Sequence, residues 1–147
     1  MQSSPAFQMY RVVQEYKDIV SKSYDTKFSL FEHFVLHHIE STQKAGCTQY
    51  EIAKVMHVLP ARVNPVIKKL EKEGYVFITH DESTMRLKKI VVATAKGREI
   101  IDYVTDQGNF AIGYPNVPES NKHTDYLVFK RFLDYMYRKI SDHRNGN

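Results

Sequence analysis

Basic side chains of the kind that bind phosphate gather in one segment of the chain. Residues 60–98 hold nine lysines and arginines against four acidic residues, a net charge of +5, whereas the whole 147-residue chain carries +4. A charge excess confined to one segment predicts a surface that faces a polyanion. The alternative is a solvated face on which basic residues cluster by chance.

The residue types in this segment suit different tasks at a nucleic acid. Arg62 and Asn64 have side chains that can read base edges, because arginine pairs with guanine and asparagine with adenine, each for about 1–3 kcal/mol of discrimination. Lys68 and Lys69 suit phosphate contacts, which position a protein without reading the base sequence. Three more basic residues lie at or just past the tip of a predicted hairpin: Arg86, Lys88 and Lys89.

Cysteine and histidine chemistry offers two further hypotheses. Cys47, the only cysteine, precedes a predicted helix whose dipole would lower the thiol pKa and favour oxidation sensing; a plain half-buried cysteine is the alternative. His33 and His37 have the i, i+4 spacing of a metal-binding pair, but ordinary histidines at the edge of a core fit the same pattern. The last helix holds no matching pair of histidines, so we predict no metal site and no cofactor.

The sequence gives little support to catalysis. It contains no nucleophile elbow, no phosphate-cradling glycine loop and no partnered pair of carboxylates, so we expect a protein that is not an enzyme. Hydrophobic residues make up 42% of the chain, which allows one compact domain with a real core. No apolar run approaches the roughly 20 residues of a membrane helix, no signal peptide is recognisable, and one cysteine suits a reducing cytoplasm.

Hydrophobic periodicity predicts the elements that would position these side chains. We expect helices over residues 6–22 and 28–42, a third after Thr48 with Glu51 completing a capping box, and a fourth that ends at Gly74. Two strands over 75–80 and 89–94 form a hairpin with a charged tip, and Thr94 starts a fifth helix. Residues 107–122 are predicted to be a linker before a last helix over 124–141. The predicted fold class is mainly α with a small β-hairpin.

Pro65 lies inside the fourth predicted helix, where proline removes a backbone donor. The helix starts at Pro60 and bends slightly at Pro65, or Asn64 caps a later helix of which Pro65 is the first residue. Apolar residues that begin before Pro65 make one continuous helical face: Val63, Val66, Ile67 and Leu70. This face favours the early start.

Helix, turn, helix and a hairpin with a basic tip follow one another in the order of a winged helix-turn-helix. With the stretches TQYEIAKVM, ARVNPVIKKLEKEGYV, DESTMR and VVATAKG, residues 28–105 resemble the MarR/SarA group of bacterial winged-helix transcriptional regulators. The resemblance implies that the second helix of the pair enters the DNA major groove and that the hairpin, or wing, reaches the flanking minor groove.

Two positions depart from the family pattern. Met85 stands where the family has an aspartate that orients the wing arginine, here Arg86, so Asp81 or Glu82 would have to take that role. Ala93 replaces a leucine in the element that follows the wing.

The resemblance also implies how the chain is organised and what it binds. Residues 1–147 would form one regulator, with 28–105 binding DNA and 6–24 and 123–142 serving as dimerisation helices in a homodimer on a pseudo-palindromic site. Double-stranded DNA, a second copy and a small-molecule effector are the expected partners, with no membrane. The residues expected at DNA are Thr48, Gln49, Pro60, Ala61, Arg62, Asn64, Pro65, Lys68, Lys69, Thr84, Arg86, Lys88 and Lys89.

Three alternatives stay open on the sequence. The winged helix can be a protein-binding module whose basic residues only keep it soluble. The terminal helices can fold back on their own subunit. A metal- or redox-sensing variant of the regulator is the third alternative.

Overall fold

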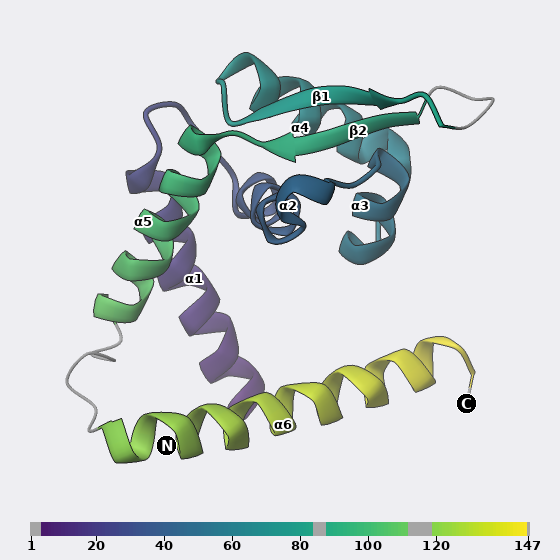
Figure 1. Cartoon of the computed structure of the whole chain (residues 1–147). Coiled ribbons are helices and arrows are strands. Elements are labelled where there is room, and N and C mark those ends of the chain that lie inside the picture. The colour runs from purple at the N-terminus through teal and green to yellow at the C-terminus, as the bar shows by residue number, and fades with distance from the viewer. Residues whose placement is uncertain (1–3, 84–87, 112–118, 147) are drawn as a thin grey trace. The chain divides into compact units, whose positions relative to one another are not determined.

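The computed structural model describes residues 4–83, 88–111 and 119–146. The chain divides into two compact units, Met1–Gly108 and Asn109–Asn147. In chain order the elements are α1 (Pro5–Ser23), α2 (Leu30–Ser41), the 3-10 turn η1 (Gln43–Ala45), α3 (Gln49–Met56), α4 (Pro60–Lys72), β1 (Val76–Asp81), β2 (Lys88–Ala93), α5 (Ala95–Ala111) and α6 (Glu119–Arg144) (Figure 1). The predicted fold class, mainly α with a β-hairpin, is confirmed.

Side-chain caps fix where the helices of the first unit begin. The Thr48 hydroxyl accepts from the Glu51 amide at 3.1 Å, and the Glu51 carboxylate accepts from the Thr48 amide at 3.1 Å, which is the predicted capping box of α3. At α5 the Thr94 hydroxyl accepts from the Gly97 amide at 3.1 Å, so Thr94 starts that helix as expected. These bonds satisfy amides that a helix leaves without internal partners.

The fourth helix starts at Pro60 and continues through Pro65 to Lys72, so the predicted early start is confirmed. The four residues of its apolar face are buried: Val63, Val66, Ile67 and Leu70. Burying an aliphatic side chain contributes about 1.5–3 kcal/mol, whereas a proline inside a helix costs about 3 kcal/mol. Together the four side chains outweigh the proline.

The hairpin pairs β1 with β2 in antiparallel register, from Val76 opposite Ala93 to Asp81 opposite Lys88. Each strand therefore lies one residue nearer the tip than predicted. Cys47 adds an antiparallel bridge to β2, since its amide donates to the Val91 carbonyl at 3.0 Å and its carbonyl accepts from the Val91 amide at 2.8 Å. This bridge ties the hairpin to the segment in front of α3.

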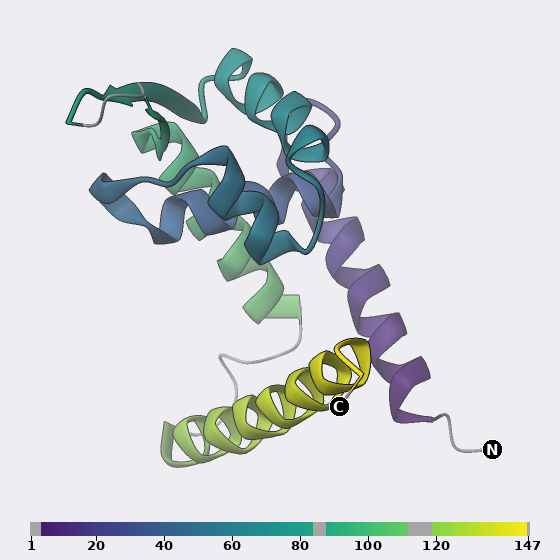
Figure 2. The same ribbon diagram turned by 90° about the vertical axis from the view of Figure 1, so that its right-hand side faces the viewer.

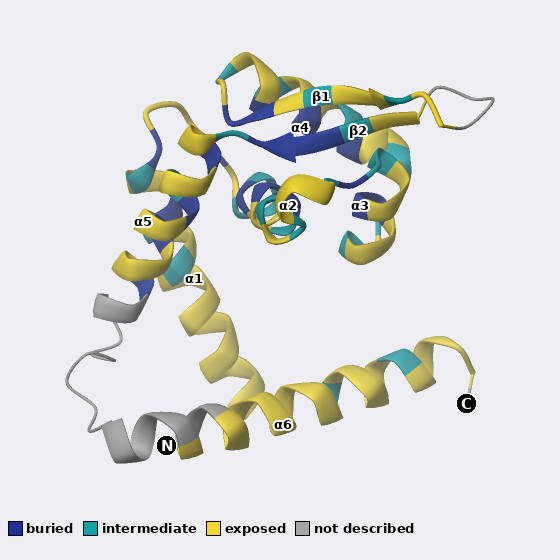
Figure 3. Ribbon diagram, in the orientation of Figure 1, coloured by how far each residue is buried: buried dark blue, intermediate teal, exposed yellow. Residues whose placement is uncertain are grey.

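The core of the first unit lies around α2. Buried side chains of α2, α3, α4 and β2 meet there, and only the last part of α1 joins them, through Val20 (Figure 3). In Figures 1 and 2 α4 and the hairpin lie on the same side of α2 and α3. The two elements expected to meet DNA are thus held on one side of the unit by a shared core.

The predicted linker over 107–122 is wrong at both ends, because α5 continues to Ala111 and α6 begins at Glu119. Gly108, which suggested a break, is buried at a close approach of α5 to α1: a Cβ at this position would lie 2.8 Å from Cε2 of Tyr16. A glycine can thus be required for packing inside a helix. Residues 112–118 lie outside the described residues. Among the helices that are described, none is long and apolar enough to span a bilayer.

Candidate nucleic-acid interface

The helix-turn-helix is held together at the start of both its helices. The side-chain amide of Gln49, in the first turn of α3, donates to the backbone carbonyl of Pro60 in the first turn of α4 at 2.7 Å. Between the helices His57 adopts a left-handed conformation with φ of 56° and ends α3. Thr48 and Gln49, both expected at DNA, are therefore half-buried residues that also shape the motif.

Four exposed residues form a stripe along the outward face of α4, at i, i+4, i+7 and i+11 spacing: Ala61, Pro65, Lys68 and Lys72. We call these four residues the α4 stripe. Arg62 and Glu71 are also exposed, on its two flanks. The first half of the stripe is small and its second half is basic. The stripe lies opposite the buried face of the helix, so it is the part of α4 that a groove in DNA would receive.

Arg62 and Asn64 lie on opposite flanks of the α4 stripe. The guanidinium carbon of Arg62 is 4.4 Å from the centroid of the Phe31 ring, on the flank that faces α2. Arg62 is exposed and Asn64 is half-buried. Both predicted base readers therefore border the stripe rather than lie on it.

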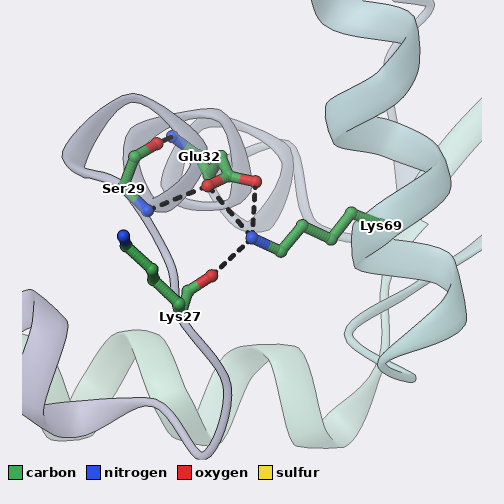
Figure 4. Close-up of polar contacts among 4 residues, drawn as sticks. All are labelled: Lys27, Ser29, Glu32 and Lys69. Atoms are coloured by element: carbon green, nitrogen blue, oxygen red, sulfur yellow. Dashed lines mark hydrogen bonds and ion pairs between the residues drawn. The ribbon is translucent and has the colours of Figure 1, made fainter.

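Lys69 is turned toward α2 and away from the α4 stripe. Its ammonium nitrogen lies 2.9 Å from the Oε2 atom of Glu32, which belongs to the first turn of α2 (Figure 4). Sequence reasoning expected Lys69 beside Lys68 at a phosphate, and the structure separates the two side chains.

On the hairpin, Lys88 and Lys89 are exposed at the start of β2, opposite Asp81 and His80. The Asp81 carboxylate accepts from the amide and the hydroxyl of Ser83 at 2.9 and 2.6 Å. These bonds lower the pKa of Asp81, with a smaller contribution from the charge of Lys88. Asp81 thus shapes the start of the tip, while the tip residues Thr84, Met85 and Arg86 lie outside the described residues.

The environment of Cys47 contradicts the expectation of a lowered thiol pKa. The residue is 2% exposed, and burial raises the pKa of its thiol to about 11 although a hydrogen bond with Thr42 opposes the shift. The thiolate, which is the reactive form, is therefore disfavoured. The structure supports the plain buried cysteine.

His33 and His37 lie next to each other, with ring centroids 6.4 Å apart, but in different environments. His37 is exposed, whereas His33 is fully buried and its Nδ1 atom is 2.7 Å from the Tyr24 hydroxyl. Burial lowers the pKa of His33 to about 4, with a further contribution from His37. His33 is thus a neutral core residue.

Sequence reasoning missed two exposed residues of this region, Lys72 in the α4 stripe and Leu59 directly before α4. Leu59, the residue before α4, is 77% exposed although it is large and apolar. Lys72 completes the stripe. The signal for both was available, since Leu59 directly precedes Pro60 and Lys72 follows Lys68 by one helical turn.

Comparison with known proteins gives a match to one family model and matches to many solved structures with a similar fold. The MarR family model matches residues 28–86. Comparison with curated proteins gives no significant match. The structure of MarR superposes with a TM-score of 0.73 at 16% identity, covering 96% of this chain and 96% of that one.

Two further solved structures were determined with bound partners. Staphylococcus aureus MepR in complex with DNA has a TM-score of 0.66 at 16% identity and covers 91% of this chain and 99% of its own. CouR from Rhodococcus jostii, bound to p-coumaroyl-CoA, has a TM-score of 0.59 at 27% identity, with 83% and 87% covered. Residues 28–86 thus match the MarR family, and the chain has the winged-helix fold seen in MarR and MepR.

Proposed function

We propose that the protein is a transcription regulator that binds double-stranded DNA, with α4 in the major groove and the hairpin in the flanking minor groove. The observation that carries the proposal is the α4 stripe, whose four exposed residues include no acidic side chain, although the exposed Glu71 lies beside it. In Figure 1 α4 lies on the same side of α2 and α3 as the hairpin, whose second strand begins with the exposed Lys88 and Lys89. A helix of this kind fits the major groove. MepR, which shares the fold, has been solved in complex with DNA.

The proposed interface residues fall into three groups by the contact that each would make with DNA. Ala61 and Pro65 are small enough to let the helix backbone approach base edges, and their apolar atoms suit thymine methyl groups. Arg62 and Asn64, on the two flanks, read base edges. Phosphate contacts come from the exposed lysines of α4 and β2: Lys68, Lys72, Lys88 and Lys89.

The other residues expected at DNA lie at the helix starts and at the hairpin tip. Thr48, Gln49 and Pro60 lie at the starts of α3 and α4, where backbone amides point outward and favour a phosphate. Thr84 and Arg86 belong to the hairpin tip, and Arg86 is proposed to enter the minor groove, whose negative potential attracts a guanidinium.

The proposed regulator acts as a homodimer on a pseudo-palindromic site in the cytoplasm. Support comes from large apolar side chains that are 40–62% exposed along α6: Leu127, Val128, Phe129, Phe132, Leu133, Tyr135, Tyr137 and Ile140. In α1, Phe7, Tyr10 and Val12 are each more than half exposed. Apolar surface on this scale marks an interaction site, and a two-fold axis would present α4 twice, one DNA turn apart.

We further propose that the regulator responds to an effector. CouR, at 27% identity, has been solved with p-coumaroyl-CoA. This likeness supports a small organic molecule as the signal to which the regulator responds.

The proposal is tested by selecting duplexes from a random pool with the purified full chain and then changing Arg62 and Asn64 to alanine. We expect Arg62→Ala and Asn64→Ala to relax base preference at particular positions of the site by about 1–3 kcal/mol each. Sedimentation of the bound complex should give two chains per duplex. A failure to enrich any sequence, together with unchanged affinity in both variants, would contradict base reading by α4.

A further inference from the structure

The ammonium group of Lys69 contacts three oxygen atoms of the protein, although its side chain is 34% exposed. It donates to the Oε1 atom of Glu32 at 3.2 Å, lies 2.9 Å from Oε2 of the same carboxylate, and donates to the backbone carbonyl of Lys27 (Figure 4). A lysine has three N–H donors and no acceptor. Three oxygens therefore surround the Lys69 ammonium, and a DNA phosphate would compete with the Glu32 carboxylate for it.

The carboxylate that receives Lys69 is itself held in place. Glu32 belongs to a capping box at the start of α2: its Oε1 atom accepts from the Ser29 amide at 2.9 Å, and its own amide donates to the Ser29 hydroxyl at 3.1 Å. Burial alone would raise the pKa of Glu32, but the bonds from Ser29 and Lys69 outweigh it and lower that pKa. Lys69 is thus joined to a charged and well-oriented anchor.

Two aromatic rings, Phe31 in α2 and Phe28 just before it, contact basic side chains of α4 at two levels. The ammonium of Lys69 lies 4.3 Å from the centroid of Phe28, and the guanidinium of Arg62, two turns earlier in α4, lies 4.4 Å from that of Phe31. Phe28 is 3% exposed and stacks on Tyr24 with ring centroids 4.4 Å apart. The flank of α4 that faces α2 therefore contacts aromatic rings, of which Phe28 is buried in the core.

We propose that Lys69 is a positioning residue of the DNA-reading helix, which sets the orientation of α4 on the capping box of α2 and makes no phosphate contact itself. This inference rests on the proposed DNA-binding function. Its immediate neighbour Lys68 is exposed on the α4 stripe and makes no hydrogen bond or ion pair with the described residues. The two adjacent lysines therefore have different tasks and provide a matched comparison.

The test uses the full chain, a duplex selected by the wild type from a random pool, and a scrambled duplex of the same length. Lys69→Met keeps the aliphatic stem and removes the charge, and Glu32→Gln keeps the acceptor for Ser29 while weakening the link to Lys69. Lys68→Met is the control. Affinities for both duplexes are measured over a series of salt concentrations, and denaturant unfolding gives the stability of each variant.

Loss of positioning should affect sequence reading, whereas loss of a phosphate contact should weaken all DNA alike. We expect Lys69→Met and Glu32→Gln each to lower the ratio of selected to scrambled affinity by about three- to tenfold, and the double variant to lower it no further, because the two residues act as one unit. The slope of log K against log salt should stay that of the wild type. Lys68→Met should reduce this slope by about 0.9 and leave the ratio unchanged.

The proposal is overturned if Lys69→Met behaves as Lys68→Met, with a smaller salt slope and an unchanged ratio. It is also overturned if Glu32→Gln leaves the ratio at the wild-type value, and this variant keeps the test valid if Lys69→Met does not fold. A wild type that binds neither duplex would overturn the proposed function and the role of Lys69 with it. Wild-type binding with an unchanged ratio in both variants would overturn the role of Lys69 alone.

Discussion

The side-chain amide of Gln49 donates a hydrogen bond of 2.7 Å to the backbone carbonyl of Pro60, and so joins the first turns of α3 and α4. Pro60 has no amide hydrogen, and Leu59 provides no side-chain cap. The start of α4 is therefore fixed from outside, by a residue of the preceding helix. Gln49 and Lys69 hold α4 at two places along its length.

Replacing Gln49 by alanine should lower the free energy of unfolding by about 1 kcal/mol, because the half-buried Pro60 carbonyl loses a partner. Urea denaturation measures the change. Gln107→Ala, at an exposed position of α5, is the control and should have almost no effect. Equal stability of the two variants would mean that the bond does not hold the motif together.

Replacing Pro65 by alanine restores an amide that can donate to the Ala61 carbonyl within α4. We expect the variant to be more stable than the wild type by about 1–3 kcal/mol, as for removal of a proline from a helix interior. Pro60→Ala is the matched control, since proline at the first position of a helix is already favourable and its loss should change stability little or lower it. A Pro65→Ala variant that is less stable in denaturant would show that the proline contributes to packing.

The neutral, buried state of His33 predicts how stability depends on pH. Its pKa of about 4 in the folded chain lies below the value of 6.5 expected when it is exposed, so only the unfolded chain binds the proton between these limits. Stability should fall as the pH is lowered through this window, by up to about 3 kcal/mol from this residue.

The contribution of His33 is isolated by comparing unfolding free energies of wild type and His33→Gln from pH 8 to pH 4. The variant should show a shallower decline below pH 6.5. His143→Gln, at an exposed position of α6, should follow the wild-type curve. Parallel curves for wild type and His33→Gln would contradict a neutral His33 in the core.

Burial of Cys47 predicts a thiol that reacts slowly. With a pKa of about 11, little thiolate is present near neutral pH, and the residue is only 2% exposed. Modification by a disulfide reagent should be at least tenfold faster in denaturant than in buffer. Rapid and complete modification of the native protein would reopen the redox hypothesis.

Local chemistry explains why much of the fold could be predicted from sequence. The Thr48–Glu51 capping box and the apolar face of α4 act over a few residues, so their patterns were enough to place α3 and α4. The box of Ser29 and Glu32 has the same spacing, but the apolar run from residue 28 predicts an earlier helix start than the structure shows.

Contacts between distant segments explain what could not be predicted. Lys69 and Glu32 are 37 residues apart, and no local pattern separates this paired lysine from Lys68, which pairs with none of the described residues. Gly108 lies inside a helix, where a Cβ would come within 2.8 Å of the Tyr16 ring on a different helix. Such features depend on contacts with residues far away in the sequence, and local sequence patterns do not predict these contacts.

The most direct test of the account is a salt series of DNA binding by fluorescence anisotropy, with wild type and a Lys68→Ala/Lys88→Ala/Lys89→Ala variant. The account predicts that wild-type affinity falls steeply with salt and that the variant binds more weakly, with a slope smaller by about 2–3, since each phosphate contact contributes about 0.9. Wild-type protein that leaves duplex DNA unbound at low salt, or a variant whose slope matches the wild type, would contradict it.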